Sequence, residues 1–391
     1  MLEKEFQKAR SLFPHAGKVV YFNSASFGPF CQPVREAIEQ NLQTRVEAAI
    51  DDTPGVMNVQ NELRGDYAGL IGASPRQVGI GMNTSFGLNI AAFGLPLKPG
   101  DEVLVSDVEF PAQVYTWRAA AQERRLKLTF VESNKRRFDI DSFERALTDR
   151  SKVLALSFVQ YFNGYKNDLA AISEVCQRRD IFLVVDGIQG MGVEPIDVKA
   201  LGMDVFSSGC QKWMLGPQGC GFFYLADQVR DRLSHPFMGW LGVDWKMNFT
   251  DLFKFDLPYF DSARRFEMGY YVALNILGMK ASVELFKTLG IENIQHHNYA
   301  LIDRLADYIR GNDFYTITSF MEPRHRSSIF SFTCGPLEKL FRRLADERSV
   351  VAQREGSIRV SVHLFNDESD IDRLISALDD FSGSYRRPRS S

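Results

Sequence analysis

The chain has few cysteines, no excess of charge of either sign and no long apolar run. Its five cysteines stand far apart, at Cys31, Cys176, Cys210, Cys220 and Cys334. No two have the spacing of a zinc site or a redox dithiol, so we expect a reducing, cytoplasmic environment without disulfides. No apolar stretch approaches the ~20 residues needed to cross a bilayer, and the N-terminus lacks the apolar core of a secretory signal.

The charge balance excludes two further classes of protein. The 391 residues carry 46 basic and 49 acidic side chains, a formal net charge of −3, and the basic residues are dispersed. A dedicated nucleic-acid binder or membrane-surface protein needs a concentrated basic footprint. A small uncharged or zwitterionic substrate fits this composition better.

Residues 33 to 226 alternate short apolar runs with helical periodicity, which predicts an α/β domain with a mostly parallel central sheet flanked by helices. The expected strands are 103–105, 128–130, 153–156 and 182–185, and the expected helices are 112–122, 141–147 and 169–178. An irregular aromatic-rich stretch, 235–260, follows, and then a smaller α+β pattern. We expect an N-terminal segment packing with the small domain (1–20), a large domain (21–265), a small C-terminal domain (266–383) and a disordered tail (384–391).

The smaller pattern has its own periodicities. It predicts helices at 271–289, 291–310, 337–345 and 368–381, and strands at 315–318, 329–332 and 358–361.

Two titratable residues follow neighbouring apolar runs. Asp186 closes the run Val184-Val185, and Lys212 stands between small residues and the glycine-rich stretch 216–219. In an open parallel sheet, ligands bind at the carboxyl ends of strands. A poorly solvated lysine has a lowered pKa and becomes a nucleophile toward an aldehyde, and an anion can keep a pyridine nitrogen protonated. Pyridoxal phosphate needs both groups.

A phosphate cradle is available upstream. The run 81–89 places Asn83, Thr84 and Ser85 at the start of an expected helix, where backbone N–H groups and hydroxyls bind anions. A simple helix cap has the same composition.

Together these residues resemble the class V aminotransferase family. This family comprises fold-type I pyridoxal phosphate enzymes, including cysteine desulfurases, selenocysteine lyases, isopenicillin N epimerase-like proteins and kynureninase. The resemblance runs from Tyr21-Phe22-Asn23-Ser24-Ala25 to the region of Arg359, nearly the whole chain. It implies a homodimer with a shared active site and an amino acid or amine as substrate.

The resemblance also assigns roles to single residues. Lys212 matches the lysine that forms the Schiff base, Asp186 the partner of the pyridinium nitrogen, and Gln189 the contact of the phenolic oxygen. Thr84, Ser85 and Gln211 match phosphate ligands. Phe110 takes the place of a stacking histidine, Gln160 or alternatively Asn163 that of an amide near the phenolic oxygen, and Tyr270 belongs to a segment that reaches the neighbouring subunit's phosphate. Arg359 matches the arginine that binds the substrate carboxylate, with Arg354 as a weaker candidate.

Two departures from the family bear on the reaction. Phe110 can stack on a ring but cannot shuttle a proton. Desulfurases carry a reactive cysteine between the two arginine motifs, whereas Arg354 and Arg359 are close in sequence with no cysteine between them. Cys334 fits a packed thiol better than a nucleophile, and Cys210 fits the surroundings of the cofactor.

The sequence therefore predicts a pyridoxal phosphate enzyme in which Lys212 moves the Cα proton. We expect an aminotransferase, with an epimerase or racemase and a β-lyase as alternatives of the same family. Two other hypotheses have less support. A fold that has lost turnover would not need Lys212, Asp186 and Arg359 together, and a nicotinamide-dependent dehydrogenase would need a G-x-G-x-x-G turn, which is absent.

Overall fold

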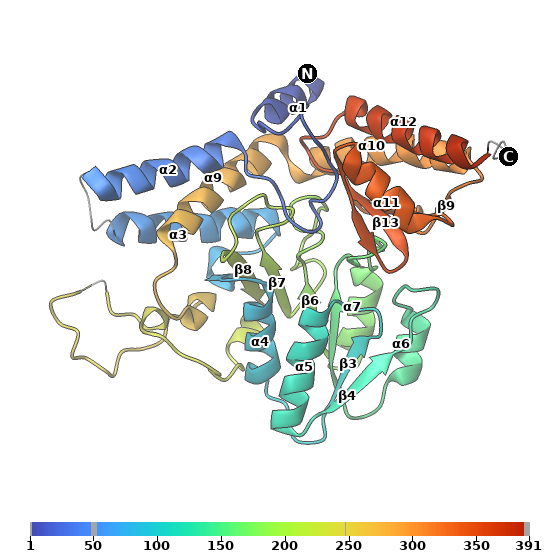
Figure 1. Cartoon of the computed structure of the whole chain (residues 1–391). Coiled ribbons are helices and arrows are strands. Elements are labelled where there is room, and N and C mark those ends of the chain that lie inside the picture. Colours follow the sequence, from blue (N-terminus) through green and yellow to red (C-terminus); the bar gives the residue numbers. More distant parts are fainter. Residues whose placement is uncertain (1, 48–52, 247, 387–391) are drawn as a thin grey trace.

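The larger part of the molecule is built around one sheet. The computed structural model describes residues 2–47, 53–246 and 248–386 (Figure 1). Within them, seven strands form the sheet in the order β2-β8-β7-β6-β5-β3-β4. These strands are β2 (Val78–Gly81), β3 (Glu102–Ser106), β4 (Lys127–Val131), β5 (Ser151–Ser157), β6 (Phe182–Asp186), β7 (Val205–Gly209) and β8 (Gly221–Leu225). Strands from β4 to β7 pair in parallel, and β8 is antiparallel to both neighbours, so the expected mostly parallel sheet is confirmed.

Helices flank this sheet, and several begin on recognisable caps. They are α2 (Gln32–Glu47), α3 (Thr53–Leu70), α4 (Thr84–Gly94), α5 (Pro111–Arg124), α6 (Ile140–Ala146), α7 (Leu169–Arg178), α8 (Asp227–Arg230) and α9 (Ala273–Leu289). The side chain of Asn83 accepts from the N–H of Phe86 at the start of α4, and α5 begins with Pro111. Both arrangements suit the first turn of a helix, whose N–H groups lack internal partners.

The smaller part of the molecule has its own sheet. Its strands pair in the order β12-β13-β10-β9, all antiparallel, and β1 pairs in parallel with β11. The elements are β1 (Val20–Tyr21), β9 (Thr316–Ile317), β10 (Ile329–Thr333), β11 (Ser349–Val350), β12 (Ala352–Arg354), β13 (Ser357–Ser361), α10 (Ile291–Arg310), α11 (Leu337–Asp346) and α12 (Glu368–Arg386). The N-terminal helix α1 (Leu2–Ser11) contacts this part, because Arg10 pairs with Asp370 at 2.6 Å and Phe6 stacks on His297.

Two boundaries differ from the expectations. The side chains that α9 buries belong to the larger core, although the sequence placed this helix in the small domain. Helix α12 continues to Arg386, so the disordered tail predicted from residue 384 is wrong for its first residues. Tyr385 packs against Phe381 and Phe314, and this apolar contact extends the helix. The rest of the predicted tail lies outside the described residues.

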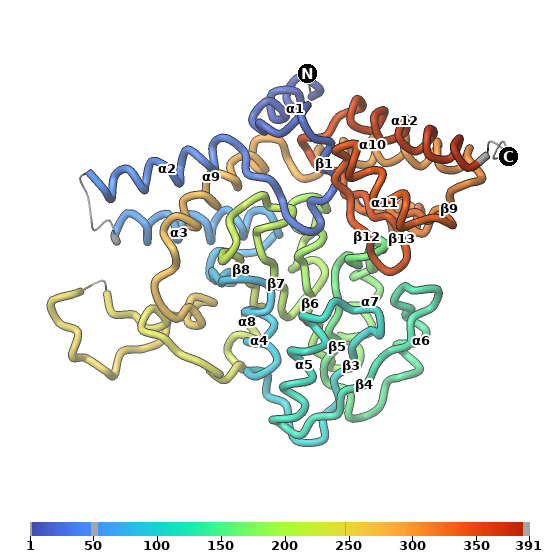
Figure 2. Tube along the Cα trace, viewed as in Figure 1, coloured from blue at the N-terminus to red at the C-terminus, as the bar shows by residue number. Residues whose placement is uncertain are grey.

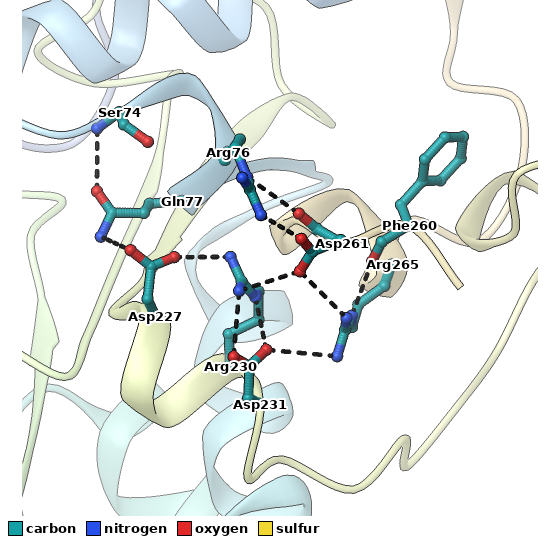
Figure 3. Close-up of polar contacts among 9 residues, drawn as sticks. All are labelled: Ser74, Arg76, Gln77, Asp227, Arg230, Asp231, Phe260, Asp261 and Arg265. Atoms are coloured by element: carbon teal, nitrogen blue, oxygen red, sulfur yellow. Dashed lines mark hydrogen bonds and ion pairs between the residues drawn. The ribbon is translucent and has the colours of Figure 1, made fainter. Parts of the chain in front are cut away.

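The described part of the aromatic-rich stretch 235–260 is irregular, as expected, apart from a 3-10 turn at Trp240–Gly242, and a second 3-10 turn, Ala263–Phe266, follows the stretch. Charged residues attach the segment just after the stretch to the rest of the large domain (Figure 3). Arg230 of α8 is buried and pairs with Asp227 at 2.7 Å and with Asp261 at 3.2 Å, and Arg76 also pairs with Asp261. Among the described helices, none is long and apolar enough to cross a membrane.

Candidate active site

The candidate site lies along one edge of the large sheet. Strands β7, β6, β5 and β3 are consecutive neighbours in the sheet (Figure 2). They run in parallel, so their carboxyl ends meet at this edge. Lys212 follows β7, Asp186 ends β6, Ser157 ends β5, and Glu109 follows β3. Ligands of open α/β sheets bind at this edge. The structure therefore brings together the two residues that carried the sequence-based prediction.

Lys212 is a partly exposed lysine whose amine is nevertheless enclosed by protein. Its Nζ lies 5.3 Å from the centre of the Phe110 ring. Burial lowers the pKa of Lys212 to about 8, the charge of Asp186 opposes this effect, and Arg359 and Arg354 add to it. A larger fraction of neutral amine at physiological pH makes Lys212 a better nucleophile.

Asp186 is a buried carboxyl without a salt bridge to any described residue. It accepts a hydrogen bond from the N–H of Ile188 at 2.9 Å. Burial raises the pKa of Asp186 to about 6, while this hydrogen bond and the charge of Lys212 lower it. A buried carboxylate with no fixed cation is suited to a protonated ring nitrogen, which would supply the missing positive charge.

Glu109 is a second buried carboxyl at the site, and it was not among the residues predicted from the sequence. It accepts hydrogen bonds from the N–H and the hydroxyl of Ser157 and, at 2.8 Å, from Nε2 of Gln160. Burial raises the pKa of Glu109 to about 7, and the negative charge of Asp186 adds to the rise. Its position directly before Phe110 was visible in the sequence, but no local pattern marks a carboxyl as buried.

The start of α4 offers a phosphate site. The hydroxyl of Thr84 accepts from the N–H of Gly209 at 2.9 Å, which joins the first turn of α4 to the end of β7. Ser85 is partly exposed at the same turn. The buried Oε1 of Gln211 has no hydrogen-bond partner among the described residues. Hydroxyls, free N–H groups and an unpartnered amide beside a helix N-terminus fit a phosphate group.

The side-chain amides predicted to contact the cofactor differ in how many of their polar atoms already form hydrogen bonds within the protein. Gln189 donates from Nε2 to the carbonyl of Ala25 at 3.1 Å and accepts from the indole of Trp213 at 2.8 Å. Asn163 uses both ends of its amide within the chain. Gln160 is buried, and its Oε1 has no partner among the described residues. Of the two alternatives, Gln160 therefore retains a free polar atom and Asn163 does not.

Two arginines project from adjacent strands of the small sheet. Arg359 of β13 is buried and donates to the carbonyl of Tyr161 at 2.6 Å, to Asn23 at 3.3 Å and to Ser26 at 2.7 Å. Arg354 of β12 donates to the same hydroxyl of Ser26 at 3.3 Å. Neither arginine forms an ion pair within the described part of the chain. Burial, followed by the charge of Arg354, lowers the pKa of Arg359 to about 9.

Tyr270 lies apart from these groups. It is 54% exposed and packs edge-on against Trp240, with ring centres 5.1 Å apart. A role for Tyr270 at a second subunit's phosphate stays a prediction.

The cysteines offer no exposed thiol beside Lys212 in the described residues. Cys210 is fully buried, and its sulfur contacts the hydroxyl of Tyr67 at 3.0 Å. Cys334 follows β10 and packs against the smaller core, and burial raises the pKa of its thiol to about 11. β12 and β13 are joined by a tight turn through Glu355 and Gly356, so no cysteine-bearing loop separates the two arginines.

Proteins of related sequence include some named as aminotransferases and some named as cysteine desulfurases. The chain is 26% identical over 377 residues to an uncharacterized aminotransferase, YcbU, of Bacillus subtilis, covering 95% of this chain and 97% of the relative. It is also 26% identical over 387 residues to a probable cysteine desulfurase of Methanothermobacter thermautotrophicus, covering 93% of this chain and 95% of the relative.

Solved structures share the fold. A mutant of C-DES, with glycine covalently linked to its pyridoxal phosphate cofactor, matches with a TM-score of 0.86 and 22% identity, covering 95% of this chain and 99% of that one. The cysteine desulfurase CsdA of Escherichia coli matches with a TM-score of 0.85 and 22% identity, covering 97% and 98%. The model of class V aminotransferases, a pyridoxal phosphate-dependent family, matches residues 20–374. The chain belongs to the class V aminotransferase family.

Proposed function

We propose that this protein uses pyridoxal phosphate held by Lys212 to cleave the bond between Cβ and sulfur of an α-amino acid, with the disulfide amino acid cystine as the leading substrate. The observation that carries the proposal is the enclosed amine of Lys212, whose pKa is lowered to about 8 by burial and by the charges of Arg359 and Arg354, against the opposing charge of Asp186. When bound, the cofactor supplies an aldehyde for the imine and a ring that accepts electrons from Cα.

The chain's own residues have separate roles in the proposed reaction. Arg359 and Arg354 bind the α-carboxylate, since neither guanidinium has an acidic partner in the described residues, and a guanidinium holds a carboxylate in a defined orientation. Asp186 keeps the ring nitrogen protonated. Lys212 removes the proton from Cα, because a neutral amine tethered at the reacting centre is an effective base.

The ring of Phe110 favours a leaving group that needs no proton. Phe110 is the side chain that faces Lys212 at 5.3 Å, and a phenyl ring is neither an acid nor a base. A persulfide leaves as a stable anion, whereas a leaving hydroxide needs an acid. The balanced reaction is cystine and water giving pyruvate, ammonia and cysteine persulfide. A structural neighbour with a TM-score of 0.85 and 22% identity, the cystine C-S lyase C-DES, was solved with cysteine persulfide as its reaction product.

Transamination, the activity expected from the sequence, is the second candidate. The Bacillus subtilis relative carries the name of an aminotransferase over nearly its whole length. Transamination would need the same removal of the Cα proton by Lys212 but would lose no substituent from the substrate. The two candidates therefore differ in their products and not in the roles of Lys212, Asp186 and the two arginines.

Product analysis separates the candidates. The protein, loaded with pyridoxal phosphate, is incubated with cystine and with a panel of amino acids, with and without added keto acids. We expect pyruvate and persulfide from cystine without any keto acid. A new amino acid formed only when a keto acid is present would establish transamination instead, and inversion at Cα alone would establish an epimerase. A cofactor spectrum that responds to no amino acid would contradict both candidates.

A variant of Lys212 tests the assignment of this residue, and a variant of a second lysine serves as the matched control. Lys212→Ala is expected to lose the visible absorption of the bound cofactor and all turnover. The exposed Lys199 serves as control, and Lys199→Ala is expected to behave as the unchanged protein. Retention of the absorption band in Lys212→Ala would contradict the assignment.

We also propose that the protein is a homodimer in which the segment around Tyr270 completes the phosphate site of the second subunit. Support comes from the exposure of Tyr270 and its aromatic neighbour Trp240 at the surface. Light scattering tests the dimer, and Tyr270→Ala is expected to weaken cofactor binding without changing the mass of the particle.

A further inference from the structure

Ser26 lies where the two arginines of the small sheet converge. Nη2 of Arg359 donates to Oγ of Ser26 at 2.7 Å, and Nη2 of Arg354 donates to the same oxygen at 3.3 Å. Ser26 belongs to the N-terminal loop, more than 300 residues away in sequence. A turn closed by its own N–H and the carbonyl of Asn23, at 2.9 Å, holds it in place.

The two hydrogen bonds that the Ser26 hydroxyl accepts determine which hydrogen-bonding capacity it has left. A serine hydroxyl has two acceptor lone pairs and one donor proton. Two guanidinium N–H groups occupy the lone pairs, so the proton is directed away from both arginines. No described residue accepts it. Ser26 therefore presents a donor, and it is partly exposed, whereas Arg359 is buried.

The positive charges around Ser26 favour the binding of an anion. Two guanidinium groups share one oxygen, and no acidic side chain of the described residues pairs with either of them. The buried Nε of Arg359 also lacks a hydrogen-bond partner. Like charges this close repel each other, and burial makes each charge more costly. One carboxylate placed between the guanidinium groups would relieve both effects and would lie within reach of the hydroxyl of Ser26.

We propose that Ser26 is a substrate-binding residue that donates its hydroxyl proton to the substrate's α-carboxylate while it holds Arg354 and Arg359 around that group. The inference rests on the proposed function only in requiring an amino acid as substrate, and it holds for elimination and transamination alike.

Ligand binding to the loaded enzyme tests the proposal apart from turnover. Glycine and methylamine both carry an amine, and only glycine carries a carboxylate. Spectral titration of the bound cofactor gives a dissociation constant for each. In Ser26→Ala we expect glycine to bind roughly tenfold or more weakly, the usual loss for a hydrogen bond to a charged group, and methylamine to bind as before. With the reactive amino acid, KM rises by a similar factor and kcat changes little.

Two variants make the result specific. Ser26→Thr keeps the hydroxyl and is expected to restore glycine binding. Ser24 lies two residues away, is fully buried, and its hydroxyl has no hydrogen-bond partner among the described residues. Ser24→Ala therefore removes a nearby hydroxyl without touching the arginines, and glycine binding is expected to stay unchanged.

The proposal is overturned if Ser26→Ala binds glycine as tightly as the unchanged protein, or if it loses methylamine binding equally. The second result would mean that Ser26 supports only the fold of the loop. Failure of the proposed function would look different, because the unchanged protein would then show no spectral response to any amino acid.

Discussion

The amine of Lys212 lies 5.3 Å from the centre of the Phe110 ring, and the two residues follow strands β7 and β3 at the same edge of the sheet. Phe110 is 38% exposed, and its ring packs edge-on against that of Tyr161. A planar ligand attached to Lys212 would meet this ring. We therefore predict that Phe110 stacks on such a ligand and that Lys212 carries out the proton transfer.

Removal of the Phe110 ring is expected to weaken cofactor binding. Stacking of aromatic rings contributes about 0.5–1.5 kcal/mol beyond simple burial, so the dissociation constant of pyridoxal phosphate in Phe110→Ala rises roughly 2- to 10-fold. Equilibrium dialysis measures the change. Phe110→Tyr keeps the ring and serves as control. Unchanged affinity in the alanine variant would show that Phe110 does not stack on the cofactor.

The lowered pKa of Lys212 predicts how cofactor attachment depends on pH. Below a pKa of about 8 the amine is mostly protonated and cannot attack an aldehyde, and above it the neutral amine dominates. The initial rate of imine formation between apo-protein and pyridoxal phosphate, followed by absorbance, is expected to rise with pH and reach half its maximum near 8. A midpoint near the ordinary value for lysine would contradict the enclosed environment.

The raised pKa of Glu109 predicts a loss of stability as pH rises. Because the folded-state pKa of about 7 exceeds the unfolded value, ionisation disfavours the folded state. Stability is fully present below the unfolded pKa and is lost as pH rises to about 7. Asp186, with a raised pKa of about 6, acts in the same direction.

Urea unfolding of the apo-protein between pH 5 and pH 8 measures this effect. Glu109→Gln cannot ionise, so the unchanged protein is expected to lose up to about 3 kcal/mol of unfolding free energy relative to the variant over that range. Parallel curves for the two proteins would show that Glu109 does not titrate in this window.

A buried ion pair fixes the start of the segment that contains Tyr270. Arg64 donates from Nε to Glu267 at 2.8 Å, and Glu267 also accepts from the N–H of Ile80 at 2.9 Å. Both side chains of the pair are nearly inaccessible to solvent. Loss of one partner leaves a buried charge unpaired, so Glu267→Gln is expected to lower the unfolding free energy by about 3–5 kcal/mol.

The double variant Arg64→Met with Glu267→Met is the control for this pair. It removes both charges together and is expected to recover much of the loss, since two apolar side chains leave no unpaired ion. Chemical denaturation measures all three proteins. A single variant as stable as the unchanged protein would show that water or a counterion reaches the pair.

The packed thiol of Cys334 predicts that sulfur release does not pass through this residue. Its raised pKa of about 11 keeps it protonated at neutral pH, and a thiol is a poor acceptor compared with a thiolate. Cys334→Ala is expected to keep the rate of pyruvate and persulfide formation from cystine. Loss of activity in a folded Cys334→Ala variant would place the thiol in the reaction.

The sequence by itself determined the features that are local in the chain. The alternation of apolar runs and helical periods predicted strands β3, β4, β5 and β6 and most of the helices, because the burial of one face gives each element its own period. Lys212, Asp186 and Arg359 were recognisable from the residues around them, and the comparisons confirm the family that those motifs indicated.

Only the tertiary structure decided which distant groups meet and which polar groups are buried. Ser26 and Arg359 are joined by a hydrogen bond across 333 positions of sequence, and no periodicity in either segment predicts this contact. In the sequence, nothing distinguishes Glu109 from an exposed acid, and it becomes buried only because the ends of β3 and β5 enclose it in the fold. Helix α9 joins the larger core because its apolar face packs against α2 and α3. Burial and proximity depend on the packing of whole elements, which a single chain pattern does not specify.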